Sequence, residues 1–156
     1  MAQIVFTDRE MQRAWRNNFQ ASNYSSRSNA HRLLLFYSIE CGLKAVLMKR
    51  QCVTTTDCCG EITDAQHNIN KLLDCLSAGQ SLKLPDQLQM TPIRTQKGQM
   101  VERKVDAGKI NQVWRYGGIL VDTVNSSFAI SKIEDDKLEK QLMCISKWIQ
   151  QELNAS

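Results

Sequence analysis

The stretch from Leu33 to Met48 constrains the fold more than any other part of the sequence. It is the longest apolar stretch, and charge interrupts it only at Glu40 and Lys44. It is shorter than the about 20 residues needed to cross a bilayer, so it predicts no membrane span. It predicts instead a buried central helix from about Ser26 to Arg50. The expected inward positions are Ala30, Leu33, Leu34, Tyr37, Cys41, Lys44, Ala45 and Met48. Gly42 costs about 1 kcal/mol inside a helix, so it predicts a close crossing by another helix.

Three capping boxes predict the starts of three further helices. Thr7 and Glu10 open a helix that runs to about Gln20. Thr63-Asp64-Ala65-Gln66 opens a second helix, which places His67 in its first turn, and Ser131-Lys132-Ile133-Glu134 opens the last. The expected inward positions are Met11, Ala14, Trp15 and Phe19 in the first of them, Ile69, Leu72, Leu73 and Leu76 in the second, and Leu138, Leu142, Ile145, Trp148, Ile149 and Leu153 in the last. The predicted fold is therefore mainly α.

Helical periodicity fails between Ser77 and Asn111. Two short runs, Met90–Thr95 and Gln99–Val105, are joined by a glycine-containing turn and predict a small β-hairpin. Asp106 is expected to cap a short helix that ends at Gly117-Gly118, and Ile119–Val124 to form one more strand. The β-structure is thus an insertion around residues 88–125.

Length and composition favour one domain over residues 1–156. The chain is 42% hydrophobic and 23% charged, as is usual for a globular domain. The N-terminus lacks a basic region followed by an apolar one, which predicts a cytoplasmic protein with reduced thiols. Cys52, Cys58 and Cys59 lack zinc-finger spacing, so we expect no metal site. The sequence has no Walker loop or dinucleotide motif, so we expect no cofactor and exclude a phosphate-cradling ATPase.

Positive charge is concentrated at the N-terminal end of the chain. Residues 1–50 hold eight Lys/Arg against three Asp/Glu. Such a bias favours an acidic partner, for example nucleic acid. A solvated basic face is the commoner explanation of the same pattern.

Three motifs resemble the HEPN superfamily. Asn29–Leu47 is similar to the signature helix, with its "E-x-x-LKA" core at Glu40–Ala45. His67–Leu73 is similar to the "H-(D/N)-(L/I)-x-x-L-(L/I)" start of the helix that follows, and Trp114-Arg115-Tyr116 to the "(W/R)RY" before the last helices. The resemblance implies an antiparallel bundle of four to five helices that forms a homodimer.

Many HEPN proteins are metal-independent endoribonucleases with an Arg four to six residues before a His. In this family Arg holds the scissile phosphate and His moves a proton. Here the nearest pair, Arg27 and His31, has three intervening residues. The i, i+4 spacing puts both on one helix face, and Arg32 adds a charge beside them. The alternative for this pair is a solvent-facing helix start.

Three further residues are candidates for binding nucleic acid or a partner protein. His67 either docks a partner or caps its helix. Arg115 and Tyr116 either bind phosphate and stack on a base, or Trp114 fills the core while Arg115 pairs with a carboxylate such as Glu40.

The leading hypothesis is a degenerate, non-catalytic HEPN-like subunit that binds RNA, a nucleotide or a partner protein encoded nearby. The resemblance implies a prokaryotic toxin–antitoxin or phage-defence system. The alternative is a dimeric endoribonuclease toxin. A third hypothesis, a sequence-reading DNA binder, has no helix-turn-helix spacing behind it.

Overall fold

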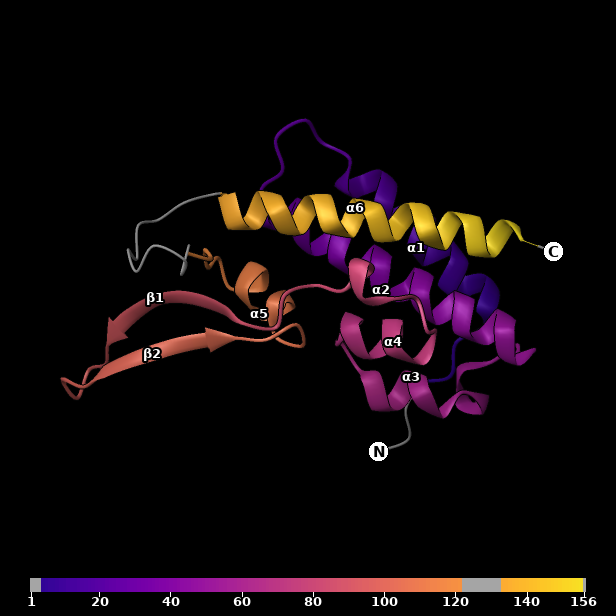
Figure 1. Cartoon of the computed structure of the whole chain (residues 1–156), viewed down its shortest axis with the longest axis horizontal. Helices are drawn as coiled ribbons and strands as arrows, with labels where there is room; N and C mark the ends of the chain where they lie inside the picture. Colours follow the sequence, from indigo (N-terminus) through magenta and orange to yellow (C-terminus); the bar gives the residue numbers. More distant parts are fainter. Residues whose placement is uncertain (1–3, 122–132, 156) are drawn as a thin grey trace.

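The computed structural model describes residues 4–121 and 133–155, apart from the side chain of Ile133 (Figure 1). The helices are α1 (Asp8–Ser22), α2 (Asn29–Gln51), α3 (Gly60–Ala65), α4 (Ile69–Cys75), α5 (Ile110–Arg115) and α6 (Ile133–Asn154). The strands are β1 (Leu88–Arg94) and β2 (Met100–Val105), and two 3-10 turns cover Thr56–Cys58 and Gln80–Leu82. The prediction of a mainly α chain with a small hairpin is confirmed. Among the described residues no helix is long and apolar enough to cross a membrane.

The central helix is α2, and it is buried on almost every side. Its fully buried side chains are Leu35, Phe36, Ile39, Leu43 and Met48, each with 0% exposure. The predicted helix is confirmed, and its predicted inward positions are right in part. Ala45 and Met48 are buried, and Leu33, Tyr37 and Cys41 are partly buried against the core, but Ala30 is exposed. The prediction misses fully buried residues because α1, α4, α5 and α6 all contact α2, so its apolar surface is not a single stripe.

The helix α1 forms an antiparallel hairpin with α2. Thr7 caps α1 as predicted: its hydroxyl accepts from the Glu10 N–H at 3.1 Å, and the Glu10 carboxylate accepts from the Thr7 N–H at 3.0 Å. Trp15 lies in the core, and its carbonyl accepts a 2.7 Å bond from the buried Ser38 hydroxyl of α2. This bond fixes the two helices against each other at mid-length.

The long helix α6 runs in the same direction as α2. Near its start Glu139 accepts from Arg32 of α2 at 2.6 Å, and near its end Glu152 pairs with Arg50 at 3.2 Å. The expectation of an entirely antiparallel bundle is therefore wrong for α6. The chain returns to the beginning of α2 before α6 starts, where the Asn29 amide donates to the Gly118 carbonyl at 2.9 Å. The predicted box at Ser131-Lys132-Ile133-Glu134 includes residues outside those described.

The second predicted capping box is wrong. Thr63 lies inside α3, and Gln66, with φ 50°, ends that helix. The next helix, α4, begins after Asn68, whose side chain accepts from the Lys71 N–H at 3.2 Å. His67 therefore lies between α3 and α4 rather than in a first helical turn.

The hairpin projects from one end of the helical body (Figure 1). Leu88 pairs with Val105 and Ile93 with Val101, with an irregularity between Met90 and Ile93. The predicted cap of α5 at Asp106 is wrong, because the Asp106 carboxylate accepts from the Gly108 N–H at 2.9 Å, in the turn before the helix. Gly117, with φ 74°, follows the end of α5 as predicted. Of the predicted strand Ile119–Val124, Leu120 bridges to Met90 and the Val121 N–H donates to the Gln89 carbonyl at 2.9 Å, and residues 122–124 lie outside those described.

Gly42 lies where α1 and α6 both cross α2. A β-carbon at this position would lie 2.7 Å from Cδ1 of Trp15 and 2.8 Å from Cδ1 of Ile149. Real β-carbons do not approach other atoms so closely. The predicted close crossing is therefore confirmed.

We expect Gly42→Ala to destabilise the protein by about 1 kcal/mol or more. Overpacking against the Trp15 ring costs about 1–3 kcal/mol, which exceeds the gain of about 1 kcal/mol in helix propensity. Urea unfolding followed by circular dichroism measures the difference. Gly60→Ala is the matched control, because no atom lies within 4 Å of a β-carbon there. A Gly42→Ala protein as stable as Gly60→Ala would contradict the crossing.

Candidate functional site

Arg27 and Arg32 are both held against α6. Arg27 donates from Nε to the Ser22 carbonyl at 2.8 Å and pairs with Glu139 at 3.4 Å. Arg32, which is 8% exposed, pairs with the same carboxylate at 2.6 Å and with Asp136 at 3.4 Å. Both guanidinium groups are thus occupied in joining the start of α2 to α6. Neither is presented to a ligand.

His31 closes the N-terminus of α2. Its Nδ1 accepts from the Ser28 N–H at 3.1 Å, and the His31 N–H donates to the Ser28 hydroxyl at 3.4 Å. The ring also stacks on Tyr24, with centroids 4.4 Å apart. Arg27 faces α6 while His31 faces Ser28 and Tyr24, and no hydrogen bond between described residues joins the two. The two side chains are thus held by different partners.

His67 is joined to a buried carboxylate. Its Nδ1 lies 2.8 Å from Oε1 of Glu40, which is 7% exposed, and the other oxygen of Glu40 accepts from Lys44 at 3.1 Å. Half of the His67 side chain is exposed, and its ring centroid lies 6.1 Å from that of Tyr37. His67 is therefore fixed on one side and open to solvent on the other.

Arg115 lies at the surface beside two tyrosines. It donates a hydrogen bond to the Tyr37 hydroxyl. Hydrogen bonding to Tyr37, and then to Tyr116, raises the pKa of Arg115, so the guanidinium stays charged. Tyr116 is 76% exposed. The expected alternative partner, Glu40, is taken by Lys44 and His67.

Trp114 fills the core, as one of the two predictions for this motif stated. It is 2% exposed, and its indole N–H donates to Asp135 of α6 at 2.7 Å. Burial raises the pKa of Asp135, although the Trp114 bond and the nearby Arg32 lower it in part. The motif thus faces two ways, with Trp114 in the core and its two neighbours in solvent.

These contacts form one continuous set on the surface of α2. We call it the polar row, and its members are Lys44, Glu40, His67, Tyr37, Arg115 and Tyr116. The first five positions are linked by the contacts above, and Tyr116 adjoins Arg115. The row leads from the α3–α4 junction to the end of α5.

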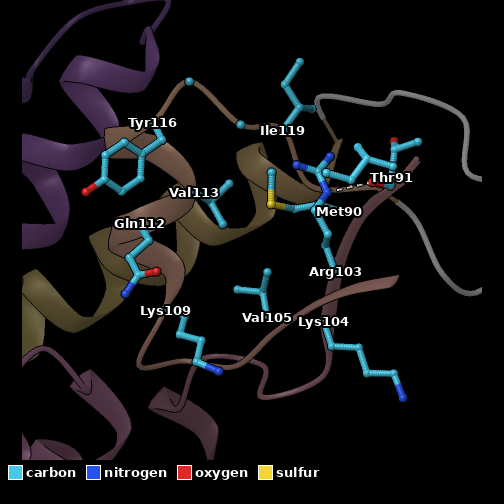
Figure 2. Close-up of a pocket in the computed structure, with 13 residues that line it drawn as sticks. Met90, Thr91, Arg103, Lys104, Val105, Lys109, Gln112, Val113, Tyr116 and Ile119 are labelled. Carbon is cyan, nitrogen blue, oxygen red and sulfur yellow. Dashed lines mark hydrogen bonds between the residues drawn. The ribbon is translucent and has the colours of Figure 1, made fainter. Parts of the chain in front are cut away.

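At the Tyr116 end, the row meets a hollow of about 680 Å³ between the hairpin and α5, which we call the hairpin groove (Figure 2). Its apolar lining residues are Met90, Ile93, Val105, Val113 and Ile119. Tyr116 lines the groove on the α5 side. Figure 2 shows the exposed Tyr116 ring at the edge of the groove, on the side of the helices.

Three cations line the hairpin groove, and no carboxylate does. Arg103 donates from Nε to the Thr91 carbonyl at 2.8 Å, which fixes its guanidinium beside Met90 (Figure 2). Lys104 lies 4.0 Å from Glu102 and Lys109 lies 3.8 Å from Asp106. Both lysine pairs are exposed and contribute about 0–1 kcal/mol each, so they compete weakly with an added anion.

No metal centre is formed by the residues that the structure describes. No group of three or more His, Cys, Asp or Glu side chains among them is arranged to hold an ion. Cys52 and Cys58 are exposed and Cys59 is buried, and all three are free thiols.

Comparison with protein-family models, curated proteins and solved structures gave no match.

Of the candidate residues, the structure brings Arg115, Tyr116 and His67 into the polar row. The groove cations Arg103 and Lys109 were not among the candidates. A signal was present, because residues 88–105 hold four Lys/Arg against one acidic residue. Only the strand register and the position of α5 show which of these cations share a surface.

We expect Arg32→Ala to lower the free energy of unfolding by about 3–5 kcal/mol, because Glu139 would keep its burial and lose its closest partner. His31→Ala should cost about 1 kcal/mol, the usual value of an N-terminal cap. Arg16→Ala is the control, since Arg16 is exposed on α1 and should change stability by less than about 0.5 kcal/mol. Urea unfolding measures all three. An Arg32→Ala protein as stable as Arg16→Ala would show that Arg32 is free for a ligand.

We expect Asp135→Asn to gain stability relative to the natural protein as pH rises. The pKa of Asp135 is raised in the folded state, so the unfolded carboxyl ionises first, from about its ordinary value of 3.8. This ionisation favours the unfolded state of the natural protein until the folded carboxyl also ionises. The Asn variant lacks that effect. The unfolding free energy of the variant minus that of the natural protein should increase between acid and neutral pH. A difference that does not change with pH would refute the raised pKa.

Proposed function

We propose that the chain is a non-catalytic, HEPN-like binding subunit that binds single-stranded RNA in the hairpin groove. The observation that carries this proposal is the composition of the groove. The groove has an apolar floor, and Tyr116 and three cationic residues line it, with no carboxylate among the lining residues. Figure 2 shows the Tyr116 ring at its edge, on the helical side, and the Lys104 amino group directed outward. Bases and phosphates are the ligand groups that match such a surface.

The apolar floor favours an unpaired base. In a duplex the bases are stacked and only their edges are accessible, whereas a single strand can turn a base outward onto an aromatic ring. Tyr116 offers one face of its ring in this way. Arg103, held by the Thr91 carbonyl, is placed to contact a phosphate beside that base.

The polar row extends the same surface. Arg115 adjoins Tyr116 and carries a permanent charge, and His67 offers an exposed nitrogen further along α2. A strand that leaves the groove past Tyr116 would next meet Arg115. The row thus supports a binding path longer than one nucleotide.

The positions of Arg27 and His31 support a role without catalysis. The endoribonuclease alternative requires both groups at one scissile phosphate, within hydrogen-bond reach. Arg27 is committed to Glu139, and His31 to Ser28. The toxin–antitoxin or phage-defence setting and the cytoplasmic location rest on the sequence alone.

The test is binding of labelled oligouridylate and oligoadenylate of about 12 nucleotides, followed by fluorescence anisotropy. Tyr116→Ala should weaken binding by about 1–3 kcal/mol, the usual value of one stacked base. Lys104→Gln and Lys109→Gln should each lower the salt dependence, log K against log salt, by about 0.7 for every phosphate that the variant no longer neutralises. A duplex of the same sequence should bind more weakly.

Lys147→Gln is the matched control, because it removes the same charge from α6 beside Trp15 and Phe19, far from the hairpin. It should bind like the natural protein. The proposal fails if the natural protein binds no oligonucleotide at low salt. It also fails if Tyr116→Ala binds as tightly as Lys147→Gln, in which case the apolar groove would suit a partner protein instead.

A further inference from the structure

A second hollow, of about 490 Å³, adjoins the hairpin groove at the base of the hairpin. We call it the polar hollow. It shares Lys104, Val105 and Lys109 with the groove. Figure 2 shows these three residues on the side of the groove away from Ile119. The two hollows are therefore contiguous around the end of β2, so a chain molecule that occupies the groove can continue into the polar hollow.

The polar hollow differs from the groove in its chemistry. Its floor includes Leu88 and Val105, which pair across the two strands and are 7% and 6% exposed. Its polar lining residues are Asp86, Gln87, Gln89, Lys104, Asp106 and Lys109. Carboxylates are present here, whereas none lines the groove. The polar hollow can therefore accept hydrogen bonds from a ligand as well as attract a phosphate.

Asp86 is held in place through one of its two carboxylate oxygens. Its Oδ1 accepts from the Ala107 N–H at 3.3 Å and from the Asn70 amide at 3.4 Å. Asn70 is 5% exposed and is itself fixed by two bonds to the backbone of Leu84, at 2.7 and 2.8 Å. Among the described residues, no hydrogen bond or ion pair uses Oδ2 of Asp86. An ionised carboxylate has about four acceptor positions, so Oδ2 keeps about two of them for a ligand.

The other carboxylate of the polar hollow is occupied. Asp106 accepts from the Gly108 N–H at 2.9 Å through Oδ1, and its Oδ2 lies 3.8 Å from Nζ of Lys109. Asp86 is therefore the acceptor that a ligand in the polar hollow meets first.

The two lysines lie where a bound strand would cross from the groove to the polar hollow. Lys104 and Lys109 line both hollows, and their exposed ion pairs compete weakly with an added phosphate. Lysine also donates to the O6 atom of guanine in many nucleic-acid complexes. A cation and a free acceptor thus lie around one cavity.

Among the RNA bases, guanine matches this pair best. A carboxylate only accepts hydrogen bonds, and guanine presents two adjacent donors, N1–H and the N2 amino group, with the acceptor O6 beside them. Uracil has a single donor between two carbonyl oxygens, which a carboxylate repels. Adenine and cytosine each present one amino group beside an unprotonated ring nitrogen. Unpaired bases in bound RNA are commonly recognised through these edges.

We propose that the polar hollow binds a guanine base of the RNA strand that occupies the hairpin groove. The Asp86 carboxylate accepts from N1–H and the N2 amino group, and Lys104 or Lys109 donates to O6. This inference rests on the proposed RNA binding and adds a sequence preference to it. The groove and Tyr116 supply affinity for any single strand, whereas Asp86 determines which base is preferred next to it.

The test compares labelled 12-nucleotide oligouridylate with the same strand carrying one central guanosine, adenosine or inosine, by fluorescence anisotropy. Guanosine should tighten binding about tenfold, within the range of one bidentate base contact. Inosine, which keeps N1–H but lacks the N2 amino group, should tighten binding by less. Adenosine separates hydrogen bonding from stacking, because it is also a purine, and it should bind more weakly than guanosine.

Asp86→Asn should abolish the preference for guanosine. The Ala107 N–H holds the amide oxygen at the Oδ1 position, so the amide NH2 replaces Oδ2 and faces the donors of guanine. Asp64→Asn is the matched control, because Asp64 is exposed on α3 and its loss removes the same charge. This variant should keep the tenfold preference. Circular dichroism checks that both variants fold.

The outcomes separate this inference from the proposed function. If the natural protein binds all four strands equally and Tyr116→Ala weakens them all, RNA binding stands and the guanine site is refuted. A preference for guanosine that survives in Asp86→Asn refutes the role of Asp86. Absence of binding to any of the strands at low salt refutes both proposals.

Discussion

The burial of α2 on nearly all sides is the constraint on which the rest of the structure depends. A polar group in that position costs free energy unless it is hydrogen-bonded, so the buried polar side chains of α2, Arg32, Ser38 and Glu40, each fix a neighbour. Arg32 fixes the start of α6 through Glu139, and Ser38 fixes α1 through the Trp15 carbonyl. Glu40 fixes His67. The apolar residues of α2 bring the neighbouring elements into contact without fixing their orientation, and its buried polar residues fix their positions through hydrogen bonds.

Much of the helical framework follows from the sequence, because capping and periodicity are local properties. The start of α1 at Thr7 and the close crossing at Gly42 are both predicted correctly. The inward positions of α2 are predicted only in part, because periodicity identifies one face, whereas helices contact α2 on several sides and also bury Leu35, Phe36 and Ile39. The box at Thr63 fails because Gln66 adopts a positive φ that ends α3, and no other local sequence pattern predicts that helix end.

The site is harder to predict than the fold, because its geometry comes from contacts between distant residues. Arg32 resembles a free cation at a helix start, but its partner Glu139 lies 107 residues further along the chain. Conversely, Arg103 and Tyr116 share a groove only because the hairpin folds back over α5. The sequence shows that the hairpin is basic. It does not show which of its cations line the groove beside α5.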